Sequence, residues 1–150
     1  MPRTSLLFAA LLLLTGCHLP EREAALTPLP EDQPFTYGEL VIRARNQTTT
    51  ALEAFYVDAW TDLETIATGL DQTARLLPKS NGIPDTVKDR LGSQTDELRK
   101  DAKKLGEAAR AKDVKGVNEI LQRINIRVRE LGLEAKTPAP KPSPPGEEGA

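Results

Sequence analysis

Apolar residues recur at intervals of three and four positions between Phe35 and Leu133, and this spacing limits what the chain can fold into. It places apolar side chains on one face of an α-helix, whereas a half-buried strand needs strict alternation. Each helix alone is marginal in water, so the four apolar faces must be buried against one another. The sequence therefore predicts an all-α fold, an antiparallel four-helix bundle. The four stripes run over Tyr37–Phe55, Leu63–Leu77, Val87–Ala109 and Val114–Leu131.

Local signals mark where the first two helices begin. Thr36 and Glu39, three residues apart, match the capping-box pattern at a helix start. A turn is expected near Asp58, because an unbroken helix through both stripes would exceed 40 residues. Asp58 or Thr61 is then expected to cap the second helix.

The later boundaries carry breaker residues. The sequence PKSNGIPD over residues 78–85 contains Asn-Gly and two prolines, which is typical of a loop. Another turn is expected around Asp113. Gly132 follows the last apolar residue of the fourth stripe, where it is expected to close the helix in a left-handed cap.

The first residues have the anatomy of a secretory signal peptide. Arg3 is followed by nine Leu, Phe or Ala residues from Leu6 to Leu14, fewer than the roughly 20 that span a bilayer. The sequence Leu14-Thr15-Gly16-Cys17 resembles the lipobox of bacterial lipoproteins. That resemblance implies cleavage before Cys17 and a diacylglyceryl group on its thiol, which would tie the protein to a membrane.

Other roles for Cys17 conflict with the sequence. A c-type haem motif ending at His18 needs a second cysteine at position 14, where Leu14 stands. A single cysteine forms no internal disulfide. In the lipoprotein family, Asp after the lipidated cysteine retains the protein in the inner membrane, and here that residue is His18. We therefore expect a cell-envelope protein at the outer membrane, facing the periplasm.

The predicted organisation has four parts. A signal peptide over 1–16 is followed by a lipidated tether over 17–34, which contains four prolines. The helical domain occupies 35–133. A Pro-rich tail over 134–150 lacks the large apolar residues needed to offset its ordering entropy, so it is expected to be disordered.

Charge argues against a nucleic-acid partner. Without Arg3 the mature chain has 19 basic and 22 acidic residues, a net charge of −3. Nucleic-acid binding usually requires a basic excess on one face. The expected partners are the membrane, through the N-terminal lipid, and another envelope protein; the oligomeric state stays open.

Two stretches resemble the cytochrome c prime family of exported four-helix bundles. AWTDLETIATGLDQTARLLP (59–78) resembles the family's second helix and the loop after it, and AARAKDVKGVNEILQRINIRV (108–128) resembles its turn between helices three and four. The family's haem-binding Cys-x-x-Cys-His would fall on Val128, Leu131 and Gly132. None of its haem-binding residues is present, so the resemblance implies no cofactor.

Aromatic and basic residues are the candidate interaction sites. Tyr56 and Trp60 lie at the expected turn, where they either form a binding patch or plug one end of the bundle. Arg123 and Arg127, with Arg129 beside them, either meet an anionic lipid or glycan or form a solvated helix face.

No catalytic set emerges from the sequence. Neighbouring carboxylates such as Asp62 and Glu64 diverge on a helix, and no histidine is available in the fold for a Glu-x-x-His metal motif. We expect neither an enzyme nor a metal site. The leading hypothesis is a membrane-anchored, non-enzymatic interaction or scaffold module. The alternative is a haemless bundle that binds a small apolar ligand between its helices.

Overall fold

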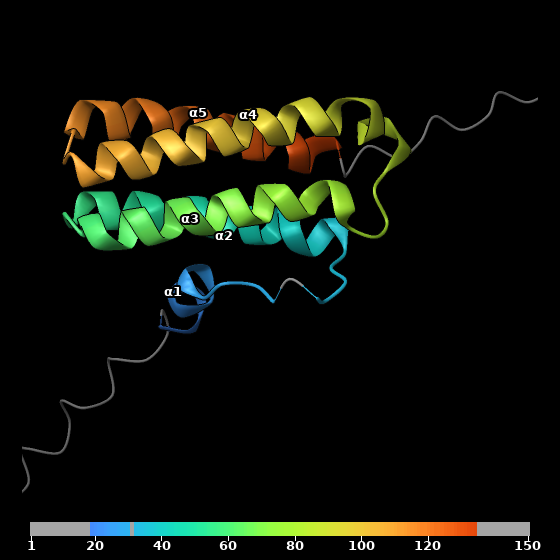
Figure 1. Cartoon of the computed structure of the whole chain (residues 1–150), viewed down its shortest axis with the longest axis horizontal. Helices are drawn as coiled ribbons and strands as arrows, with labels where there is room; N and C mark the ends of the chain where they lie inside the picture. Colours follow the sequence, from blue (N-terminus) through green and yellow to red (C-terminus); the bar gives the residue numbers. More distant parts are fainter. Residues whose placement is uncertain (1–18, 31, 135–150) are drawn as a thin grey trace, which may run out of the picture.

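The computed structural model describes residues 19–30 and 32–134, and within them the chain is all-α, with no strand (Figure 1). The predicted signal peptide, Cys17, His18 and the Pro-rich segment from residue 135 onward lie outside the described residues. The elements are α1 (Leu19–Leu26), α2 (Tyr37–Tyr56), α3 (Trp60–Leu76), the 3-10 turn η1 (Leu77–Lys79), α4 (Asp85–Arg110) and α5 (Val114–Glu134).

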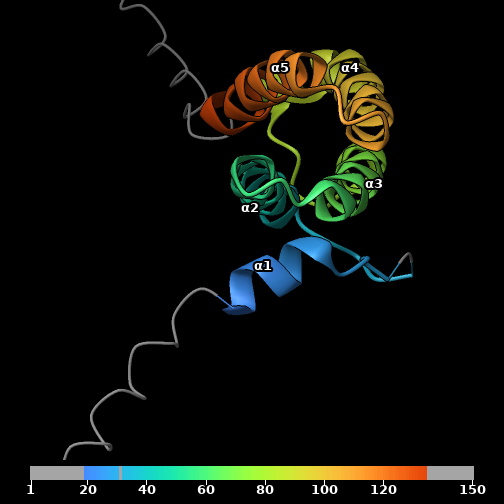
Figure 2. The ribbon, with the colours of Figure 1, turned by 90° about the vertical axis from the view of Figure 1, so that its left-hand side faces the viewer.

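The four long helices, α2 to α5, lie side by side around a common core (Figure 2). Each packs on two neighbours, in the ring order α2, α3, α4, α5 and back to α2. Short turns at 57–59 and 111–113 bring the chain back alongside itself at the same end of the molecule (Figure 1). The described chain therefore has a bundle-like helical fold, as the apolar stripes predict.

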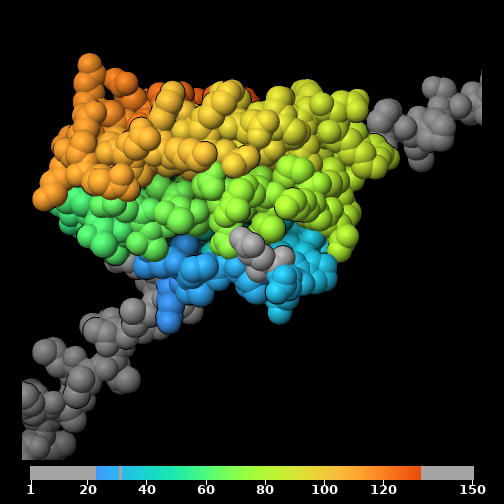
Figure 3. Space-filling model, in the orientation of Figure 1, coloured from blue at the N-terminus to red at the C-terminus, as the bar shows by residue number. Residues whose placement is uncertain are grey.

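Helix α1 packs across the outer side of α2 and α3 (Figures 2 and 3). Ala25 is buried, and Leu26 and Leu29 are half-buried against the core cluster. The sequence predicts an unstructured tether over 17–34, and that prediction is wrong for Leu19–Leu26. The physical reason is a set of polar side chains on α2 and α3 that bond to this segment, described below.

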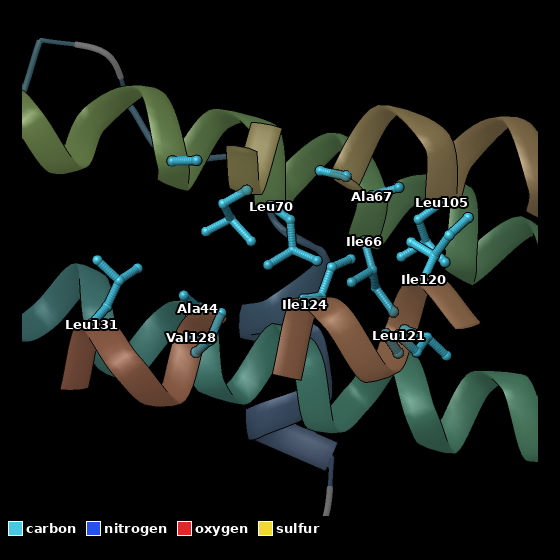
Figure 4. Close-up of a cluster of buried hydrophobic side chains, with 14 of the residues drawn as sticks. Ala44, Ile66, Ala67, Leu70, Leu105, Ile120, Leu121, Ile124, Val128 and Leu131 are labelled. Carbon is cyan, nitrogen blue, oxygen red and sulfur yellow. The ribbon is translucent and has the colours of Figure 1, made fainter. Parts of the chain in front are cut away.

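The core is built from the inner faces of the four long helices (Figure 4). The inward-facing apolar residues of the second and third stripes are buried, and Leu76 and Ala108 beside them are half-buried, which confirms the helical interpretation of both stripes. Burying a Leu or Ile side chain contributes about 1.5–3 kcal/mol. Val114 is an exception within the fourth stripe: as the first residue of α5 it projects at the end of the molecule and is 58% exposed.

The start of α2 matches its predicted capping box. The Thr36 hydroxyl accepts the Glu39 N–H at 3.3 Å, and the Glu39 carboxylate accepts the Thr36 N–H at 2.8 Å. Backbone bonds of 2.9 Å join Tyr37 N–H to Asn81 O and Asn81 N–H to Phe35 O. These bonds fasten the loop between α3 and α4 to the beginning of α2.

The turn between α2 and α3 is a Schellman motif. Asp58 has a left-handed φ of 54°, and Ala59 N–H donates to Ala54 O at 2.8 Å. The predicted turn near Asp58 is confirmed. The predicted caps are wrong, because α3 begins at Trp60 with no side-chain cap, so that Thr61 lies inside the helix and Asp58 closes α2 instead.

The turn between α4 and α5 repeats this geometry. Lys112 has a φ of 52°, and Asp113 N–H donates to Ala108 O at 2.9 Å. The Asp113 carboxylate then caps α5 by accepting the Gly116 N–H at 3.0 Å. A left-handed conformation costs a non-glycine residue about 1–2 kcal/mol, so both turns tolerate a local strain.

Gly132 does not end the fourth helix, and the prediction of a glycine cap there is wrong. Helix α5 continues to Glu134, and Gly132 is buried within it. The Arg45 guanidinium from α2 lies against Gly132, in space that any larger residue's Cβ would occupy. One residue earlier, Leu131 O accepts the Tyr37 hydroxyl at 3.0 Å. Side chains of α2 therefore cover this end of α5.

Candidate functional site

Arg123 and Arg127, one turn apart on α5, face α4. Their Nε atoms lie 3.1 and 2.8 Å from the two oxygens of the Asp101 carboxylate, whose side chain is 6% exposed. Arg127 also pairs with Glu97 at 3.3 Å. A buried carboxylate is costly unless it is paired, and here two guanidinium groups share it. Both arginines are thus engaged in joining α4 to α5.

Glu97 adds a partly exposed branch to this network. Its pKa lies below its ordinary value, first because Lys100 donates a hydrogen bond at 2.6 Å and then through the charges of Lys100 and Arg127. Arg127 is therefore paired with two carboxylates, those of Asp101 and Glu97.

Tyr56 and Trp60 flank the turn between α2 and α3, and the ring of Phe55 lies near both of their rings. The Phe55 and Trp60 rings meet edge-on at 6.2 Å, and the Phe55 and Tyr56 rings are tilted at 6.0 Å. Trp60 is half-buried against the core, whereas Tyr56 is 81% exposed. The structure brings both predicted residues into one aromatic cluster, in which Trp60 packs inward and Tyr56 faces out.

We name the exposed apolar surface at this end of the molecule the turn-end patch: Tyr56, Val57 and Val114. Val57 is 66% exposed, and Val114 starts α5 beside the other turn. The described part of the chain has five exposed large hydrophobic residues, and three of them belong to this patch. Isolated apolar residues on a surface are ordinary, whereas these three share one end of the molecule.

Arg43 holds the C-terminal end of α1. Its guanidinium donates to Ala24 O at 3.0 Å and to Thr27 O. The last carbonyls of a helix lack partners within it and carry the negative end of its dipole, so a cation there is stabilising. Burial lowers the pKa of Arg43, although a guanidinium stays protonated in proteins.

Gln47 and Gln72 hold the same segment through their amides. Gln47 Nε2 donates to Ala25 O at 3.4 Å while its Oε1 accepts the Thr73 hydroxyl at 2.9 Å. Gln72 makes two hydrogen bonds to the backbone of Leu29: its Nε2 donates to Leu29 O at 2.8 Å, and its Oε1 accepts the Leu29 N–H at 2.9 Å. Both glutamines are buried. Together with Arg43 they position the segment that follows Cys17.

This attachment was not predicted, although the sequence contains a signal of it. Gln47 lies three residues after Ala44 and four before Ala51, on the apolar side of its helix. Gly69, inside the second stripe, is the other signal, because a glycine costs helix stability and leaves room for a neighbouring group to approach the backbone. A Cβ at Gly69 would lie 2.6 Å from the Gln47 amide and 3.6 Å from Ala25 O.

Two further observations concern metals and membranes. Within residues 19–30 and 32–134, no three His, Cys, Asp or Glu side chains gather closely enough to hold a metal ion. The helices of that same part of the chain include none that combines the length and apolar character required to cross a bilayer.

Comparison with protein-family models, with curated proteins and with solved structures finds no match to this chain. The likenesses to the lipobox and to cytochrome c prime therefore stay predictions from the sequence. At the positions equivalent to the haem-binding cysteines, Val128 and Leu131 are buried in the apolar core.

Proposed function

We propose that this chain is a bacterial lipoprotein, anchored through Cys17 in the cell envelope, at the periplasmic face of the outer membrane. Its long helices form an antiparallel four-helix bundle that acts as a non-enzymatic interaction or scaffold module. The turn-end patch contacts the partner, which is another envelope protein. The lipid holds the bundle at the membrane.

The attachment of α1 supports anchoring close to the membrane. Helix α1 begins at Leu19, two residues after Cys17, and two residues of chain reach at most about 7 Å. Since α1 packs on α2 and α3, a lipid on Cys17 would keep the bundle beside the bilayer. The lipid would thereby limit which surfaces can meet a partner.

The observation that carries the interaction hypothesis is the clustering of exposed apolar residues at the turn end. Tyr56 combines a large apolar ring with a hydroxyl, and such residues are enriched among interface hot spots. The two Schellman turns fix the backbone on which Val57 and Val114 are presented. A rigid surface loses less conformational entropy when it binds.

Site-specific photo-crosslinking in intact cells tests this proposal. A photo-reactive residue would replace Val57 or Val114 in turn, with Ser93, an exposed residue of α4 away from the turn end, as the matched control. We expect the same envelope protein to be crosslinked from positions 57 and 114 and not from 93. Tyr56→Ser should reduce that adduct several-fold.

Two outcomes would contradict the proposal. Equal crosslinking from all three positions would indicate nonspecific contact. Recovery of no protein from positions 57 and 114, together with a small apolar molecule that copurifies with the bundle, would favour the ligand-carrier alternative.

A further inference from the structure

A groove of about 370 Å³ lies between α2 and α5 and has an arginine on each side. Arg45 comes from α2 and Arg129 from α5, and among the described residues none that lines the groove is acidic. The lining residues are Arg45, Thr48, Thr49, Asn125, Val128 and Arg129.

These two arginines differ from the other arginines whose side chains the structure describes. Most of those pair with carboxylates, notably Asp71 and Asp101, and Arg43 bonds to the carbonyls of α1. Arg45 and Arg129 have neither a hydrogen bond nor an ion pair with any described side chain or carbonyl. Two positive charges that border one groove, with no counter-charge among the described residues, favour an anion there.

The surroundings of the groove suit an acceptor-rich ligand. Arg45 lies against the bare backbone of Gly132, which keeps its guanidinium on the α5 side. Thr49 and Asn125 are exposed at the rim and offer a hydroxyl and an amide as donors. The buried Val128 gives the floor an apolar part.

We propose that this groove binds a phosphomonoester group. A phosphomonoester carries a charge of about −1.5 to −2 at pH 7, which matches two guanidinium groups. Guanidinium forks bond its oxygens in pairs, and these charge-assisted bonds are the stronger class. The groove also has room for the group to which the phosphate is esterified. That group is either a lipid or a soluble sugar or glycerol. The site stands apart from the turn-end patch and from the proposed function.

Calorimetric titration of the full mature protein in a neutral detergent tests the site. The probes are inorganic phosphate and glycerol 3-phosphate, with glycerol as the uncharged control. We expect both phosphates to bind and glycerol not to bind. Arg45→Gln with Arg129→Gln should weaken phosphate binding by about tenfold or more at constant ionic strength.

Two further variants separate a defined site from general charge. Arg110→Gln removes one positive charge from an exposed pair with Glu64 on the α3–α4 side and should change affinity less than twofold. Gly132→Ala keeps every charge but displaces the Arg45 guanidinium, so it should weaken binding several-fold. Absence of phosphate binding, or equal losses in the Arg110 and double variants, would overturn the proposal.

Detergent micelles doped with phosphatidic acid or phosphatidylcholine identify the source of the phosphate. Binding of the phosphatidic acid micelles and not of the phosphatidylcholine micelles, in addition to the soluble phosphates and lost in the double variant, assigns the site to a lipid headgroup. Binding of glycerol 3-phosphate without any response to phosphatidic acid assigns it to a soluble phosphate. Both results support the site and differ only in its ligand.

Discussion

Asp101 shows how one residue joins two helices. Its carboxylate lies on α4 and accepts hydrogen bonds from both Arg123 and Arg127 of α5. Asp101→Asn keeps the size of the side chain but removes its charge, so we expect a loss of about 2 kcal/mol in the free energy of unfolding. Urea denaturation of the variant and of wild type measures this difference in the free energy of unfolding. The exposed Asp96→Asn on the same helix should change stability by less than about 0.5 kcal/mol, and equal effects would contradict this account.

Glu39 gives a prediction about acid stability. Its pKa lies below the ordinary 4.5, first because its carboxylate accepts the Thr36 backbone N–H and then the Thr36 hydroxyl. A lowered folded-state pKa means that this stabilisation is complete above pH 4.5 and is lost as the pH falls through the folded value. Between about pH 5 and about pH 3, wild type should therefore lose more stability than Glu39→Gln. If the stability of wild type and of Glu39→Gln had the same pH dependence, the Glu39 carboxylate would contribute nothing to the acid sensitivity of the fold.

At the residue scale, the sequence predicted apolar burial well and polar burial poorly. Periodicity identifies which positions face inward, but it does not predict that Gln47 forms hydrogen bonds with Thr73 and Ala25. The candidate interaction residues show the same limit. The basic row makes Arg123 a candidate, yet its partner Asp101 lies 22 residues earlier on another helix. Such pairings depend on how the helices pack.

Lys112 allows a prediction at the scale of a single turn. It occupies a left-handed position that favours glycine, so Lys112→Gly should stabilise the protein by up to about 1 kcal/mol. Gln122→Gly, an exposed change in the middle of α5, should destabilise it by about 1 kcal/mol. The Tm values of the two variants should therefore shift in opposite directions relative to wild type. A shift of both in the same direction would exclude strain at Lys112.

The attachment of α1 is testable at a single amide. Gln72→Leu removes the acceptor of the Leu29 N–H, so hydrogen exchange at Leu29 should rise about fivefold to tenfold. Thr68→Ala, an exposed change on the same helix, should leave it unchanged. Unaltered exchange in the Gln72 variant would show that α1 is held by other contacts.

At the element scale, strong periodicity and a capping box were enough to predict the four long helices and the start of α2. The short helix α1 was missed because its sequence, LPEREAAL, has a proline and no clear apolar stripe. Its order depends on Arg43, Gln47 and Gln72, which come later in the chain. The prediction of a cap at Gly132 is wrong for a related reason, because it depends on a contact with a distant helix. A glycine after an apolar stripe is typical of a helix cap, but here it leaves space for the Arg45 side chain of α2.

The whole molecule combines a predicted lipid anchor, a helical body beside it and surfaces on two sides of that body. The turn-end patch is apolar and lies at one end, whereas the groove between α2 and α5 is cationic. If both proposals hold, the protein can meet a protein partner and a phosphate at the same time. Its orientation at the membrane would then depend on the link between Cys17 and α1.

The most direct test is the intact mass of the protein extracted from the membranes of a Gram-negative host. We predict a chain that begins at Cys17 and carries an added diacylglyceryl group, with Cys17→Ser as the control. That variant should lose the lipid mass and leave the membrane fraction. An unlipidated wild-type chain, or full membrane retention of Cys17→Ser, would contradict the lipoprotein assignment.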